Sequence, residues 1–258
     1  MITYELLDKY KEIAHFCTTR SGGTSVGNYA SNNLSPFSGD DFVHFSTNHN
    51  NLVELLGSEC QQIVIPFQNH GTQIRVIDDA FLELSIDQKT DYLNGVDAIF
   101  TKLQGICIGI TTADCVPLLF YDPEKNVIAA AHAGWRGTCG RIGEKTIAAL
   151  IEKYDCRPED IRVAIGPSIS AKVYEIGKEL IENFEVAGFD ISKIIIERNN
   201  SFYLDLWKAN QLSLTAIGID NNHIEIAGIC TFTEHEKYFS ARRLGIKSGR
   251  MLSGIMLK

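Results

Sequence analysis

Residues 112–137 read TADCVPLLFYDPEKNVIAAAHAGWRG, and this stretch predicts a β-hairpin. Residues 116–121 and 127–131 are short, apolar and partly β-branched or aromatic, as strands tend to be. The sequence DPEKN between them is typical of a turn, because Asp hydrogen-bonds nearby backbone and Pro fixes the second turn position. A four-residue loop over 122–125 therefore sets the expected register of the hairpin.

In this register Cys115 and His132 are direct cross-strand neighbours, with Cβ atoms roughly 5 Å apart. They suit a shared zinc ion, in which Zn–S is about 2.3 Å and Zn–N about 2.0 Å. They suit a Cys–His nucleophile pair equally well. A slip of one residue would place them on opposite faces as ordinary sheet residues. Because Pro117 lacks an N–H, its strand is expected at a sheet edge or to begin at that residue.

The composition is that of an ordinary soluble globule, with 258 residues, 45% hydrophobic and 22% charged. A net charge of −8 argues against a nucleic-acid partner, although a local arginine cluster still allows a small anionic ligand. No apolar run approaches the ~20 residues of a membrane span, so no membrane association is expected. The seven cysteines include no Cys-x-x-Cys pair and no secretory signal is present, so a cytoplasmic protein with reduced thiols is expected.

The apolar patterns predict an α+β fold, in which mixed sheets are flanked by helices. No repeat or domain boundary is evident, so residues 1–258 are expected to form a single catalytic domain. Residues 82–93 are polar and expected to be partly irregular. Besides the hairpin, strands are predicted at 13–19, 62–67, 74–77, 96–101, 106–111, 161–165, 194–198 and 223–228, and helices at 42–56, before 154, 173–187 and 204–217.

His70 is a third candidate for the site of Cys115 and His132, because it also lies where an apolar strand meets a glycine-containing turn. Two histidines and one cysteine would leave the fourth zinc position open to water, which is the pattern of a catalytic site. A surface or hydrogen-bonded structural histidine is the alternative interpretation.

The glycine-rich stretch after His132 is typical of an anion-binding loop, because its glycines Gly134 and Gly137 let the backbone approach a ligand. Arg136 in this stretch is a candidate for clamping a phosphate with two parallel hydrogen bonds. Arg20, in a second glycine-rich loop, is another candidate cation. A plain turn and solvated arginines are the alternatives.

A set of short motifs in a fixed order carries a family resemblance over residues 18–250. The motifs are TTRSGG (18–23), NL (33–34), GDD (39–41), QNHG (68–71), DA (97–98), TADCVP (112–117), AHAGWRG (131–137), IGP (165–167), YFSARR (238–243) and SGR (248–250). In this combination the chain resembles the YfiH-like laccase-domain family, which is labelled multicopper polyphenol oxidoreductase and regarded as purine nucleoside phosphorylase.

The resemblance implies one zinc ion per chain, held by His70, Cys115 and His132. It implies phosphorolysis of adenosine, inosine and methylthioadenosine, with adenosine deamination as a side activity. It also implies a fold similar to that of a glutamine-deamidating toxin that uses a Cys–His pair. Family members often have Cys where this chain has Ser168, so that position is not expected to bind metal.

We therefore predict a zinc-dependent purine nucleoside phosphorylase whose small-molecule partners are purine nucleosides and phosphate. Cys115, His132, Arg136 and Arg20 are its predicted catalytic residues, and the two arginines with Gly134 and its neighbouring glycine are expected to bind substrate. A cysteine hydrolase and a metal-stabilised binding protein are alternatives. A copper-dependent polyphenol oxidase is another, although seven histidines without a His-x-His pair argue against a multicopper cluster. Copper binding in vitro remains compatible with such a site.

Overall fold

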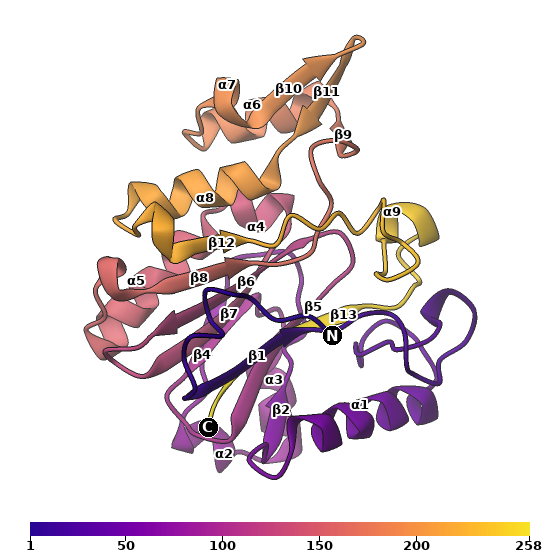
Figure 1. Cartoon of the computed structure of the whole chain (residues 1–258), viewed down its shortest axis with the longest axis vertical. Coiled ribbons are helices and arrows are strands. Elements are labelled where there is room, and N and C mark those ends of the chain that lie inside the picture. The colour runs from indigo at the N-terminus through magenta and orange to yellow at the C-terminus, as the bar shows by residue number, and fades with distance from the viewer.

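Three β-sheets organise the chain, which the computed structural model describes over residues 1–258 (Figure 1). The four-stranded sheet has the order β1 (Ile13–Cys17), β13 (Met251–Leu257), β5 (Ile106–Thr112), β2 (Gln62–Val64). The six-stranded sheet has the order β12 (Ile224–Ile226), β8 (Arg162–Ile165), β6 (Val116–Asp122), β7 (Val127–Ala133), β4 (Ala98–Thr101), β3 (Ile74–Val76). The three-stranded sheet has the order β10 (Ile195–Arg198), β11 (Ser201–Leu204), β9 (Glu175–Ile176).

Nine α-helices accompany these sheets, and none combines the length and apolar character that crossing a bilayer requires. They are α1 (Phe42–Leu56), α2 (Asp79–Leu82), α3 (Ile86–Leu93), α4 (Trp135–Cys139), α5 (Ile142–Tyr154), α6 (Lys178–Val186), α7 (Ile191–Ile194), α8 (Leu206–Ala216) and α9 (Ala241–Leu244). The short 3₁₀ helices are Gly27–Tyr29, Pro158–Asp160 and Asn221–His223. Helices α6 and α7 lie beside the three-stranded sheet at one end of the molecule (Figure 1).

The six-stranded sheet is the middle layer, because its central strands send alternate side chains into two hydrophobic cores. Leu118 and Phe120 of β6 pack in a core that also contains residues of α5 and α8. Leu119 and Tyr121 pack instead in a core shared with the four-stranded sheet. Burial on both faces explains why β6 and β7 are continuous apolar runs. The α+β class, with mixed sheets flanked by helices, is confirmed.

Local sequence signals mark the ends of two helices, α1 and α3. The helix predicted over 42–56 is confirmed: the Asp41 side chain accepts the Val43 N–H at its start, and Gly57, with φ of 83°, follows its last residue. The expectation that 82–93 is partly irregular holds only for the short turn at 83–85. Residues 86–93 form α3, which begins at a capping box between Ser85 and Gln88.

Two expectations for the C-terminal half of the chain are also wrong. The helix predicted over 173–187 begins only at Lys178, because residues 175–176 pair with β11 as strand β9. No strand is predicted in the tail, yet β13 pairs with both β1 and β5. All seven of its residues are buried, so its sequence lacks the alternation of a half-exposed strand.

The predicted hairpin forms, but its register differs by one residue in each strand. Asp122 pairs with Val127, and Pro117 pairs with His132. The Asp122 side chain accepts the N–H groups of Glu124 and Lys125 at 2.9 Å, which draws the turn one position further along the chain. The expectation that Cys115 and His132 are direct cross-strand partners is therefore wrong, but a relative shift of two positions keeps them on the same face. The strand is central rather than at an edge, and Pro117 is its second residue.

Candidate metal centre

Three side chains from separate parts of the sequence converge at one end of the central strands. The ligand atoms of His70, Cys115 and His132 all lie within 4.8 Å of one another. Tetrahedral ligands with Zn–S of about 2.3 Å and Zn–N of about 2.0 Å lie roughly 3.3–3.5 Å apart, so the donors need to approach by up to about 1.5 Å to share one zinc ion. His132 belongs to β7, Cys115 immediately precedes β6, and His70 lies in the loop between β2 and β3. The arrangement offers three donors to a metal ion.

The turn before Cys115 is fixed by the carboxylate of Asp114. This residue has φ of 84°, so the chain leaves the regular strand conformation there. Its oxygens accept hydrogen bonds from Thr231 Oγ1 at 2.7 Å, Ser240 Oγ at 2.9 Å and the backbone N–H of Arg242 at 2.7 Å. Asp114 therefore ties the segment that presents the thiol to two distant loops.

Both histidines are held by Asp97, for which the sequence motifs predicted no role. Asp97 is fully buried, and its Oδ1 lies 2.8 Å from Nδ1 of His132 and accepts the His70 N–H at 3.0 Å. Its Oδ2 accepts the Gly71 N–H at 2.7 Å. A carboxylate bound to Nδ1 keeps the proton there and leaves Nε2 free as a ligand, as in many metal sites. An acid inside the apolar run VDAIF is the sequence signal for it.

The electrostatics of the centre favour an ionised cysteine. Burial would raise the pKa of Cys115, but the charges of His132 and then His70 lower it to about 6. Burial would lower the pKa of His132, whereas Cys115 and Asp97 raise it to about 9. Burial opposes ionisation of Asp97 too, but its hydrogen bond to His132 keeps its pKa below the ordinary value. A thiolate is the form that a metal ion requires.

Two glycines allow this close packing. A Cβ on Gly134 would lie 3.0 Å from Sγ of Cys115 and 3.6 Å from Nε2 of His132, in the space between the donors. A Cβ on Gly137 would lie 3.0 Å from the carbonyl oxygen of His132 and 3.4 Å from that of Gly71. The loop thus approaches the centre closely, and substrate binding by these two glycines stays a prediction.

The two candidate phosphate-binding arginines differ in what they contact. The Arg20 guanidinium donates to the carbonyl of Ala30 at 3.0 and 2.8 Å and to that of His235 at 2.7 Å, so much of its donor capacity is used within the fold. Arg136 is exposed and stacks on the Trp135 ring, with Cζ 4.3 Å from the centroid. It forms no ion pair with a carboxylate, so its donors face solvent.

A cavity of about 370 Å³ gives access to the centre. His70, Cys115 and His132 lie in its wall together with Gln68, Arg250 and Phe37. His70 is exposed, Cys115 is half-buried and His132 is buried, so the three donors form a gradient from rim to floor. A small molecule entering the cavity would meet the donors directly. Neither Arg20 nor Arg136 belongs to its lining.

Comparison with known proteins places this arrangement in a family. The model of the family "multi-copper polyphenol oxidoreductase laccase" matches residues 14–258. The chain belongs to this family. The resemblance found in the sequence motifs is thereby confirmed.

Relatives in the laccase family carry names of nucleoside enzymes. The chain is 46% identical to a "purine nucleoside phosphorylase" of Bacteroides thetaiotaomicron, over 100% of this chain and 96% of that protein. It is 38% identical to "adenosine deaminase RL5" of an unknown prokaryotic organism, over the full length of both. The crystal structure of the hypothetical protein YfiH of Bacillus licheniformis superimposes with a TM-score of 0.89 at 29% identity, covering 98% of this chain and 94% of that one.

Proposed function

We propose that this protein is a zinc-dependent purine nucleoside phosphorylase that accepts adenosine, inosine and methylthioadenosine and deaminates adenosine as a side activity. The observation that carries the proposal is the cluster of His70, Cys115 and His132 in the wall of a cavity. The full-length similarity to proteins named for both activities supports it. The whole chain is proposed to act as one catalytic domain.

The three donors suit zinc, and we expect each chain to bind one zinc ion. Two imidazoles and a thiolate are common zinc ligands, and three protein ligands leave a fourth position for water or substrate. Bound zinc would polarise an oxygen atom or lower the pKa of a water molecule. The Asp97 carboxylate behind His132 fixes the orientation of that ligand. Copper would bind the same donors in vitro, because its affinity for such sites exceeds that of zinc.

Phosphorolysis requires a site for phosphate beside the nucleoside. The phosphate oxygen forms a bond to C1′ of the ribose while the bond from C1′ to the purine nitrogen breaks, and the electron pair leaves with the base. Arg136 is our first candidate to hold phosphate, because its guanidinium is exposed and free of carboxylates. Arg20 remains a second candidate. Cations arranged beforehand would stabilise the charge that develops in the transition state.

A cysteine hydrolase is the second candidate function, and one observation favours it. Cys115, His132 and Asp97 follow one another in the order nucleophile, base and orienting carboxylate, with the pKa of the thiol lowered to about 6. That mechanism gives His70 no role. A multicopper oxidase is less favoured, because the only cluster of metal-donor side chains has three members, which suits one ion.

Incubation of the purified protein with adenosine or inosine, with and without phosphate, tests the proposal. We expect phosphate to be required for release of the free base, with ribose 1-phosphate formed in equal amount. Adenosine should also yield some inosine without phosphate. Absence of phosphate-dependent base release from both nucleosides would contradict the proposal.

A further inference from the structure

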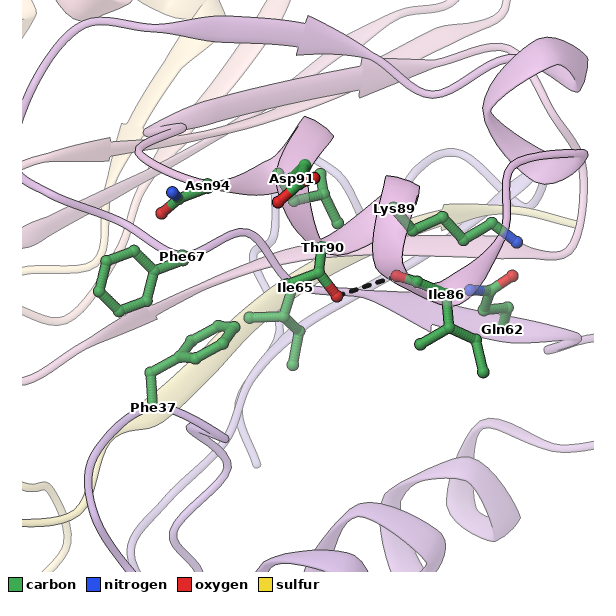
Figure 2. Close-up of a pocket in the computed structure, with 10 residues that line it drawn as sticks. Phe37, Gln62, Ile65, Phe67, Ile86, Lys89, Thr90, Asp91 and Asn94 are labelled. Carbon is green, nitrogen blue, oxygen red and sulfur yellow. Dashed lines mark hydrogen bonds between the residues drawn. The ribbon is translucent and has the colours of Figure 1, made fainter.

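Figure 2 shows a second cavity, of about 540 Å³. It shares lining residues with the cavity of the metal centre. It is bounded by α3, by the chain that continues from β2 and by the loop that carries Phe37. Its apolar lining consists of Phe37, Ile65, Phe67, Ile86 and Leu93. Its volume falls in the range of about 300–1,000 Å³ that is typical of small-molecule sites.

This cavity adjoins the one that holds the metal cluster. Phe37 and Phe67 line both cavities, and their rings meet edge to face with centroids 5.0 Å apart. Phe67 is three residues before His70 in the same loop. The intervening Gln68 accepts the Thr111 N–H at 2.8 Å and donates to its carbonyl at 2.9 Å, which fixes this segment to the four-stranded sheet. Phe37 and Phe67 therefore form an aromatic wall that the two cavities share.

The chemistry of the lining favours an uncharged apolar group. Phe37 and Phe67 are 46% and 43% exposed and Ile86 is 83% exposed, and a group of exposed apolar side chains lining one hollow is typical of a ligand-binding groove. The lining residues Lys89 and Asp91 carry opposite charges, so the cavity has no net charge to match. The Thr90 hydroxyl donates to the Ile86 carbonyl of its own helix at 2.9 Å (Figure 2), so it adds no unused donor.

We propose that this cavity is an accessory subsite for an alkyl or aryl substituent carried by the nucleoside. The inference rests on the proposed function, since it assumes that a nucleoside occupies the cavity at the metal cluster. The substituent can be attached at the 5′ carbon of the ribose or at the N6 amino group of the purine. At either attachment point, the substituent would place an apolar group against Phe37, Phe67 and Ile86.

The test compares kcat/KM for adenosine, 5′-benzylthio-5′-deoxyadenosine and N6-benzyladenosine in the presence of phosphate. At least one benzyl compound should exceed adenosine by about 10-fold or more, since even one methylene in an apolar pocket contributes that much. The compound that gains identifies which end of the nucleoside faces the subsite.

Ile86→Asp and Phe42→Asp form a matched pair of variants. Each replaces an exposed apolar residue, 83% and 77% exposed, at the first position of a helix, where an acid is tolerated. Ile86→Asp should reduce the ratio of kcat/KM for the preferred benzyl compound to kcat/KM for adenosine to about one. Phe42→Asp, which lies outside the cavity, should keep the wild-type ratio. Two results would overturn the subsite. One is turnover of adenosine with no higher kcat/KM for either benzyl compound. The other is the same kcat/KM ratio in both variants. No turnover of adenosine would instead refute the proposed function, and the subsite with it.

Discussion

Replacement of the buried carboxylate in Asp97→Asn tests how the metal centre is organised. Asp97 accepts hydrogen bonds from His132 at 2.8 Å, from the His70 N–H at 3.0 Å and from the Gly71 N–H at 2.7 Å. An amide has one accepting oxygen and directs an N–H at one of these donors. It also cannot hold the His132 proton on Nδ1 as a carboxylate does.

We expect zinc to bind Asp97→Asn about 10- to 100-fold more weakly, the usual cost of losing such a partner. Loss of a buried hydrogen bond to a charged group should also lower the unfolding free energy of the metal-free protein by about 1.5–3 kcal/mol. Because the pKa of Asp97 is lowered in the fold, its contribution is present above the unfolded pKa and lost as pH falls through the folded one. Competition with a chromophoric chelator and urea unfolding measure the two effects.

Asp122→Asn is the matched control. Asp122 is equally buried and also accepts two backbone N–H groups, in the turn at the opposite end of the hairpin from the cluster. It should lose stability and keep the zinc affinity of the wild type. If Asp97→Asn behaves in the same way, Asp97 is a structural residue and the reasoning about the histidine ligand is refuted.

Four further predictions concern single residues of the site. Cys115→Ser should abolish zinc retention and turnover while the urea midpoint changes little; global unfolding would show that the metal is structural. Arg136→Lys should reduce kcat/KM for phosphate by about 10- to 100-fold, from a lost contact of roughly 1.5–3 kcal/mol, and reduce deamination much less. Equal loss of both activities would exclude a phosphate clamp. In the metal-free protein, the rate at which iodoacetamide alkylates Cys115 should have its midpoint near pH 6, where the thiolate forms. Burial raises the pKa of Cys17 to about 11, so Cys17 should stay unreactive at pH 7. Peptide mass spectra distinguish the two cysteines. Gly134→Ala should weaken zinc binding in the chelator assay. The backbone at this position (φ −61°, ψ 173°) accepts alanine, but the added Cβ would lie 3.0 Å from Sγ of Cys115. An unchanged zinc affinity would mean that the donors can shift.

Local signals in the sequence predicted the features that depend on few neighbours. The turn chemistry of DPEKN located the hairpin, and the shift of its register left Cys115 and His132 on one face because the relative shift is two positions. Helical periodicity and Gly57 located α1, and the structure adds the Asp41 cap at its start. His70 was found because a strand followed by a glycine turn presents side chains at a rim.

Features that depend on distant parts of the chain could not be predicted. Strand β13 is buried between β1 and β5, so its sequence carries no periodicity that marks one face. Asp97 resembles an ordinary acid until the fold brings both histidines to its oxygens. The contacts of Arg20 likewise come from Ala30 and from His235, a residue far along the chain, and no local pattern announces them.

We propose that His70, Cys115 and His132 hold a zinc ion on which nucleoside phosphorolysis depends. The most direct measurement follows phosphate-dependent release of adenine from adenosine as zinc is removed with a chelator and then added back, with the metal content determined on the same samples. We predict that the activity falls in proportion to bound zinc, disappears without it and returns at one zinc ion per chain. Activity that survives complete removal of zinc, and is then lost on alkylation of Cys115, would contradict it and favour the cysteine hydrolase.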